Sequence, residues 1–204
     1  MKKRIYLLLS AVMILAFFAA CGRNTTNNDG MDNGNGNSNV NQNQNDNNNN
    51  KETNTGRLND VYQAVKSAYG ENYLPNVDID QDTLTKTYGI NMDDVVEYKA
   101  ETPMISANVD TFIGIEAKEG RADNVEAALK AYRDNLINNS VQYPANQYKV
   151  NASKVVRSGN YVFFVMLGAN NDAIIQTADE AALKQFAEEQ SQKAVDAINT
   201  TLGK

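Results

Sequence analysis

The residue with the most definite chemistry is Cys21, the only cysteine of the 204-residue chain. It stands between Ala19-Ala20 and Gly22, at the end of an apolar run. Small residues before a cysteine in this place are typical of a lipobox, where an export signal is cut and the cysteine is lipidated. Phe18 departs from the pattern, because leucine is most usual there. We predict a lipidation site at Cys21; the alternative is an ordinary signal peptide that leaves a plain thiol.

The segment before Cys21 has the three parts of a secretory signal. Met1–Arg4 is basic, residues 5–20 are apolar, and small residues precede the cut. The apolar run is shorter than the roughly 20 residues that a membrane-spanning helix needs. A thioether-linked diacylglycerol and an N-terminal acyl chain, such as palmitate, would together give stable anchoring. We therefore expect a lipoprotein signal peptide over residues 1–20, and an exported protein anchored to the outer face of the cell membrane.

Other side chains offer little chemistry. The chain has no histidine, which removes the commonest general base and metal ligand. Asp78–Asp82 starts like a calcium loop, but Thr83 and Gly89 stand where an EF-hand has Gly and Glu. We expect no catalytic residues, no cofactor and no metal. A carboxylate-dependent hydrolase of the cell envelope stays open as an alternative, and a small solute-binding lipoprotein as a third.

Tyrosines are the remaining candidates, because they combine a large contact area with a polar tip. Most of them fit the rim of a core. Tyr143 and Tyr148 flank Pro144 in an expected polar loop over residues 139–148, so we predict an exposed contact surface there. The partner would be an envelope protein or the cell wall. Nucleic acid is disfavoured, since 25 Asp and Glu outnumber 19 Lys and Arg.

Residues 21–56 form a distinct region. They are rich in Asn, with Gly, Ser, Asp and Gln among the rest, and Met31 and Val40 are their only large apolar side chains. Such a composition cannot bury enough apolar surface to offset the entropy of ordering. We predict a disordered tether that begins at the lipidated Cys21.

Residues 57–204 have the composition of one globular domain. Apolar residues at helical and alternating spacings predict helices and strands. Two capping-box patterns predict helix starts at Asp123 and Thr177, and Asp82 is expected to cap a short helix. The expected elements are a helix over 58–69, strands over 95–102 and 109–118, a helix over 123–138, strands over 152–157 and 161–167, and a helix from 178 to the C-terminus.

The order α-ββ-α-ββ-α predicts an α+β fold, with about four antiparallel strands from two hairpins and three helices packed on the sheet. The most apolar strand, 161–167, should lie centrally. Glu126–Lys130 and Glu180–Lys184 share one pentapeptide. A common helix-forming pentapeptide matches easily by chance, so an internal duplication stays open.

The chain also resembles a known family. The stretch Tyr88–Tyr98 is followed by Asp110–Ile115, then by Gln142-Tyr143, Val155-Val156 and Gly159–Val165. This succession resembles the small bacterial lipoproteins of Firmicutes catalogued as domain of unknown function 4358. The resemblance implies a cell-surface lipoprotein domain with no established activity and no functional residues to carry over.

Overall fold

The computed structural model describes residues 56–105, 107–169 and 179–204, without the side chain of Ala145. These residues belong to one unit, Asn50–Lys204. The predicted signal peptide, Cys21 and residues 22–55 of the predicted tether lie outside them. The elements are, in chain order, α1 (Arg57–Tyr69), η1 (Gly70–Asn72), β1 (Val77–Asp78), α2 (Gln81–Lys86), η2 (Met92–Asp94), β2 (Val95–Thr102), β3 (Thr111–Ala117), α3 (Ala122–Asn139), α4 (Pro144–Ala152), β4 (Lys154–Ser158), β5 (Tyr161–Met166) and α6 (Glu180–Leu202).

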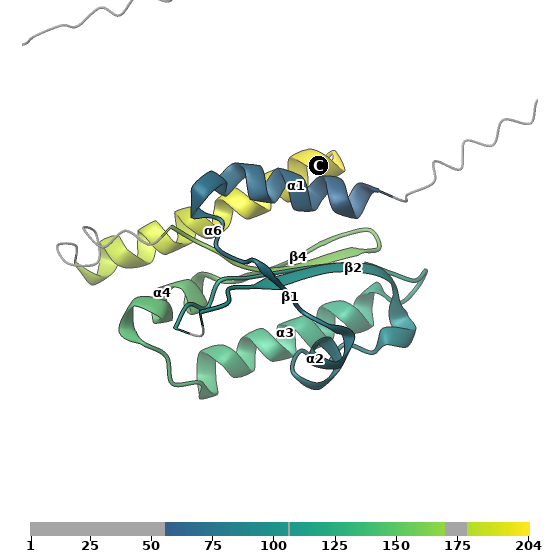
Figure 1. Ribbon diagram of the computed structural model, residues 1–204, viewed down its shortest axis with the longest axis horizontal. Helices are drawn as coiled ribbons and strands as arrows, with labels where there is room; N and C mark the ends of the chain where they lie inside the picture. Colours follow the sequence, from purple (N-terminus) through teal and green to yellow (C-terminus); the bar gives the residue numbers. More distant parts are fainter. Residues whose placement is uncertain (1–55, 106, 170–178) are drawn as a thin grey trace, which may run out of the picture. The chain divides into compact units, whose positions relative to one another are not determined.

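The α+β fold class is confirmed. One antiparallel sheet has the strand order β1-β2-β3-β5-β4, and helices cover both of its faces (Figure 1). The described residues form five strands in this sheet rather than the predicted four. The additional strand is β1, whose two residues are too few to show an alternating pattern. Among the described helices, none is long and apolar enough to cross a membrane.

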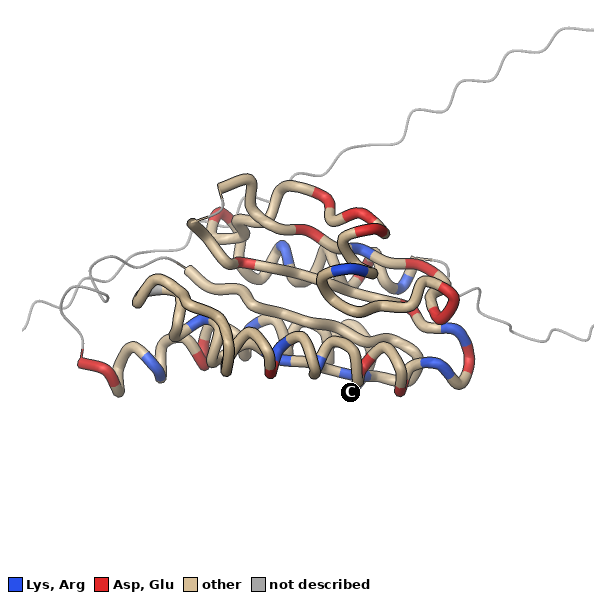
Figure 2. Tube along the Cα trace, turned by 90° about the horizontal axis from the view of Figure 1, so that it is seen from below, with Lys and Arg blue, Asp and Glu red and all other residues tan. Residues whose placement is uncertain are grey.

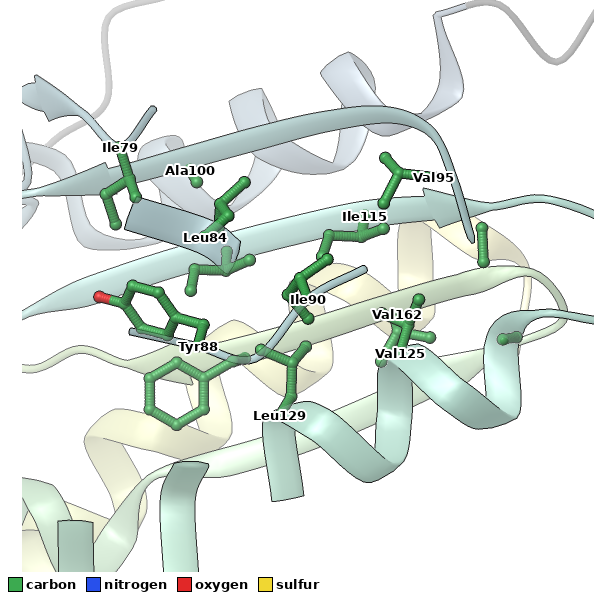
Figure 3. Packing of buried hydrophobic residues seen from close by; sticks show 14 of the residues in the cluster. Ile79, Leu84, Tyr88, Ile90, Val95, Ala100, Ile115, Val125, Leu129 and Val162 are labelled. Carbon is green, nitrogen blue, oxygen red and sulfur yellow. The ribbon is translucent and has the colours of Figure 1, made fainter. Parts of the chain in front are cut away.

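Helices α2 and α3 cover one face of the sheet, as Figure 3 shows from close by. Gly89 has a φ of 71°, a conformation that glycine adopts without strain. The turn there brings Ile90 back under α2, where its N–H donates to the Leu84 carbonyl at 3.1 Å. The core on this face includes Ile79, Leu84, Tyr88, Ile90, Ile113, Ile115, Val125, Leu129, Val162 and Phe164.

Helices α1 and α6 cover the opposite face. Their buried residues meet Phe112 and Phe163, so β3 as well as β5 is covered on both sides. The prediction of a central apolar strand at 161–167 is confirmed, whereas β3 is more enclosed than its pattern indicated. Gly114 makes the close approach of α1 feasible, because a Cβ atom there would lie 3.0 Å from Leu58 Cδ1.

Two predicted helix caps are wrong. Asp80 rather than Asp82 caps α2, accepting a hydrogen bond from the Thr83 N–H at 2.8 Å. The capping box of α3 does not form, since the helix begins at Ala122 without a side-chain cap. The Asp123 and Glu126 carboxylates contact the Arg157 guanidinium instead. At α6, Asp179 is the cap, bonded to the Ala182 N–H, and Thr177 lies outside the described residues.

Strand β2 contains an irregularity that the alternating pattern did not predict. Val95 is in register with Ala117 and Glu97 with Glu116, so Val96 is an extra residue. A bulge of this kind reverses the facing of the side chain. Val96 is accordingly 60% exposed, although its position in the alternation predicted a place on the buried face.

The two ββα halves do not form a symmetric pair. In the strand order β2-β3-β5-β4, a two-fold axis perpendicular to the sheet between β3 and β5 would exchange the two hairpins. A symmetric pair would therefore have the helix after each hairpin on the same face of the sheet. Helix α3 contributes to one core and α6 to the other, on opposite faces. The shared pentapeptide is therefore not matched by a repeated arrangement in space.

Candidate functional site

Several connections meet at one end of the sheet. Because neighbouring strands are antiparallel, β2 and β5 end where β3 and β4 begin. We call this region the loop end and define it as residues 102–105, 107–110, 135–149 and 167–169. Helix α1 begins at the opposite end of the domain (Figure 1).

A buried ion pair supports the loop end from beneath. Lys149 Nζ of α4 lies 2.5 Å from Asp110 Oδ1, just before β3. The Asp110 side chain is wholly buried, and Lys149 is 9% exposed. Burial raises the pKa of the Asp110 carboxyl, and the nearby Lys149 ammonium opposes that rise. The second carboxylate oxygen, Oδ2, has no hydrogen-bond partner among the described residues.

Further hydrogen bonds fix the connections to each other. Asn146 Nδ2 of α4 donates to the Ala107 carbonyl at 2.9 Å, which joins α4 to the β2–β3 connection. Gln190 Oε1 of α6 accepts from the Ala169 N–H at 3.2 Å. The Tyr69 hydroxyl donates to the backbone carbonyl of Gln190, which links α1 to the same residue of α6. The loop end is thus held by side chains from α1, α4 and α6.

The outer surface of the loop end is apolar and uncharged. Met104 is 76% exposed, Ile105 71%, Val141 99% and Tyr143 69%. Residues 102–109 and 135–148 contain no Asp, Glu, Lys or Arg, and their described parts are tan in Figure 2. An open groove of about 430 Å³ runs beside Met104 and Ile105 and is also lined by Leu74, Asn76, Pro103, Ala107 and Asn108.

The structure places both predicted contact residues at this end. Tyr143 precedes Pro144 at the start of α4, and Tyr148 is half-buried within that helix. The prediction of a polar loop over residues 139–148 is wrong for residues 144–148, which belong to α4. Proline suits the first position of a helix, where its missing N–H has no intrahelical partner, so Tyr143-Pro144 marks a helix start.

Two other tyrosines, Tyr62 and Tyr73, link helices to the sheet. Tyr62 donates to Glu101 Oε1 at 2.6 Å and Tyr73 donates to Glu101 Oε2 at 3.0 Å. Lys66 Nζ donates to the Tyr62 hydroxyl at 2.8 Å. It also lies 4.9 Å from the centre of the Tyr62 ring. We call Glu101, Tyr62, Tyr73 and Lys66 the tyrosine–glutamate cluster; it joins α1 and η1 to β2. Burial is the main cause that raises the pKa of Tyr73.

Sequence reasoning missed Asp110 and Lys149. A signal was present, since Asp110 is the only charged residue between Glu101 and Glu116 and directly precedes an apolar strand. Lys149 gave no comparable signal, because its contact with Asp110 depends on how α4 packs. In the acidic stretch Asp78–Asp82, which was compared with a calcium loop, Asp82 pairs with Lys86 at 2.5 Å. Another acidic residue, Asp94, is buried against Asn124 and Arg121.

The described residues contain no group of three or more His, Cys, Asp and Glu side chains placed to hold a metal ion. Four grooves on the described residues are each lined by one carboxyl group at most. What the arrangement offers chemically is contact area at the loop end, held in place by buried polar groups.

Fold and site together define a small α+β domain with an exposed, uncharged apolar surface at one end of its sheet. Residues 68–167 match the family model described as Domain of unknown function (DUF4358), so the chain carries a DUF4358 domain there. The match covers η1 to β5 and leaves most of α1 and all of α6 outside it. No curated protein and no solved structure matches the chain.

Proposed function

We propose that the protein is a lipoprotein, exported and anchored at Cys21 to the outer face of the cell membrane. Its 57–204 domain is a non-enzymatic binding module of the cell envelope, and the loop end contacts the partner. The observation that carries the binding proposal is the set of four exposed apolar side chains, Met104, Ile105, Val141 and Tyr143, in a region without charge.

The chemistry of this surface supports a partner with little charge. The whole chain is acidic, with a formal net charge of −6, yet the loop end presents amides, tyrosine and aliphatic side chains. Contact surfaces in proteins are depleted of charged residues at their centre and enriched in Tyr and Met. The buried Asp110–Lys149 pair holds α4 in place, which reduces the ordering cost of binding.

The location of the loop end also supports the proposal. The tether predicted from the sequence joins the domain at the start of α1, at the other end of the sheet (Figure 1). A domain held by that end presents the loop end away from its attachment point. The signal-like residues 1–20, Cys21 and the Asn-rich residues 22–55 together support an anchor and a spacer. The wider attribution to lipoproteins of Firmicutes is part of the same proposal.

Crosslinking in intact cells tests the binding module. A photoreactive residue at Ile105 or at Tyr143 should give the same crosslinked partner, which is an envelope protein or a cell-wall component. The matched control is Asn160, which is exposed in the β4–β5 turn at the other end of the sheet. Adducts that form equally from Asn160, or from none of the three positions, would contradict the proposal.

The anchor has a separate test. The Cys21→Ala protein should leave the membrane fraction and appear in the medium or the soluble fraction, because its lipid chains are absent. Retention of Cys21→Ala in the membrane would overturn the anchor and leave the loop-end proposal standing. The hydrolase alternative requires two carboxyl groups about 5–9.5 Å apart around a cleft. None of the four grooves named above supplies them, so these grooves do not favour that alternative.

A further inference from the structure

The outer edge of β2 is only partly occupied. Strand β1 pairs with Glu101 and Thr102 at one end of that edge. The flanking Ile79 N–H donates to the Ala100 carbonyl at 2.9 Å. The chain then leaves the edge at Asp80, which caps α2. From Val95 to Lys99, β2 pairs with β3 on its inner side, and no described strand lies on its outer side.

This open stretch presents backbone groups for hydrogen bonding. The Ala100 and Thr102 carbonyls bond toward β1 and its flanks. Backbone groups alternate in direction along a strand, so the N–H and C=O of Tyr98 point toward the same open side. Val96 is the extra residue of the bulge and has no partner in register. A row of unpaired N–H and C=O groups is a template for another strand.

A groove accompanies the open edge. It has a volume of about 380 Å³ and is lined by Gln81 of α2, Met92 of η2 and residues 95–98 of β2. Met92, Val96 and Tyr98 supply an apolar floor, and Val96 is 60% exposed. Strand addition combines backbone hydrogen bonds with pockets for alternate side chains, and this groove and edge offer both.

The charges beside the groove are mostly negative. Glu97 lines it, and Asp80, Asp82 and Asp93 adjoin its lining residues in the chain. One cation, Lys99, also adjoins a lining residue, and its Nζ lies 5.8 Å from the centre of the Tyr62 ring. Lys86 is engaged by Asp82 at 2.5 Å. Like charges directly opposite each other destabilise paired strands and opposite charges stabilise them.

We propose that the outer edge of β2, from Val95 to Lys99, binds an extended, basic segment of another protein by strand addition. The segment lies beside β2, in line with β1, where the chain has turned away at Asp80. It adds backbone pairing to the part of the β2 edge that β1 does not cover. A second copy of this chain is the less suitable occupant, because two acidic edges would face each other. The proposal concerns a surface separate from the loop end and does not rest on it.

Amide hydrogen exchange of the full chain tests the proposal. The probes are two short synthetic peptides, one of alternating lysine and valine and one of alternating glutamate and valine. The basic peptide should slow exchange of the Tyr98 amide about tenfold or more, because that N–H gains a partner. The acidic peptide should leave it unchanged. Absence of protection with both peptides, or equal protection with both, overturns the proposal.

Charge-reversal variants distinguish the effect of charges beside the groove from the effect of the net charge of the whole chain. The double variant Asp82→Lys with Asp93→Lys should bind the basic peptide about tenfold more weakly. The control variant Glu189→Lys with Asp196→Lys changes the net charge equally at exposed positions of α6, which contributes to the core on the other face of the sheet, and should bind as the natural chain does. Equal weakening in both variants overturns the local site. Protection of Tyr98 that grows with protein concentration alone identifies a second copy as the occupant and also overturns it.

Discussion

Two polar clusters join helices to the sheet, and they differ in their access to water. The Asp110–Lys149 pair joins α4 to β3 and is almost wholly buried. The tyrosine–glutamate cluster joins α1 to β2, with Glu101 and Lys66 half-buried. In the first, an ionised pair is enclosed and one carboxylate oxygen has no described partner. In the second, both Glu101 oxygens accept a hydrogen bond from a phenol.

The comparison shows why removing one side chain should destabilise the protein more in the buried Asp110–Lys149 pair than in the half-buried tyrosine–glutamate cluster. Removing one member of a buried pair leaves a charge that water cannot reach. Removing one member of a half-buried cluster lets water take its place, so the loss is limited to the hydrogen bonds. The loop end, which carries the proposed contact surface, therefore depends on the more sensitive of the two links.

The largest expected effect follows from Lys149→Met, which leaves the Asp110 carboxyl buried without its cation. The free energy of unfolding should fall by about 3–5 kcal/mol, measured by urea denaturation near neutral pH. Because Asn146 of α4 holds the Ala107 carbonyl, the loop end should loosen with α4.

The matched control removes both charges. The double variant Lys149→Met with Asp110→Leu should recover most of the lost stability, because no buried charge is left unpaired. If Lys149→Met alone costs less than the loss of an exposed ion pair, which is at most about 1 kcal/mol, the pair does not hold the loop end.

A smaller loss is expected from Glu101→Gln in the tyrosine–glutamate cluster. An amide oxygen accepts a weaker hydrogen bond than a carboxylate does, and two phenols depend on this one side chain. We expect the free energy of unfolding to fall by about 1–2 kcal/mol. Tyr73→Phe removes a single hydrogen bond of the cluster and serves as the lesser variant. A loss as large as that of Lys149→Met would remove the distinction between the two clusters.

The pH dependence of stability distinguishes the clusters in another way. Burial raises the pKa of Asp110 above the ordinary value of 3.8, so the folded state holds this proton to higher pH than the unfolded state does. The contribution of Asp110 is full below the ordinary pKa and is lost as pH rises through the folded pKa. Unfolding should be measured across this range for the natural chain and for Asp110→Asn. The stability difference, natural minus variant, should fall as pH rises; a rise would mean that Lys149 lowers the pKa of Asp110.

Local sequence patterns predicted much of the fold. The alternating and helical spacings located β2, β3, β5, α1, α3 and α6, because each buries a regular set of apolar side chains. Strand β1 was missed because two residues are too few to show an alternation of apolar and polar side chains. Helix α4 was missed because its sequence, Pro144–Ala152, is mostly polar and its place depends on Lys149 reaching Asp110.

The candidate site was less predictable from the sequence. Tyr143 and Tyr148 were found through their residue type and the neighbouring proline, and they do lie at the loop end. Met104 and Ile105 carry no signal of exposure, because an apolar pair after Pro103 could equally belong to a core. The bulge at Val96 was likewise invisible, since a register shift arises only when β2 meets β3.

The smallest effect is expected from Lys66→Met in the tyrosine–glutamate cluster. The Lys66 ammonium donates to the Tyr62 hydroxyl and lies over its ring. A half-exposed contact of this type contributes about 0.5–1 kcal/mol, so the change in unfolding free energy should stay within that range. Burial and then Glu101 raise the pKa of Tyr62, and Lys66 opposes them. The pKa of Tyr62, followed by phenolate absorbance, should therefore rise further in Lys66→Met. Lys99→Met is the control, because Lys99 lies farther from the ring, at 5.8 Å; an equal rise in both variants would mean that net charge, and not the Lys66 contact, sets the pKa.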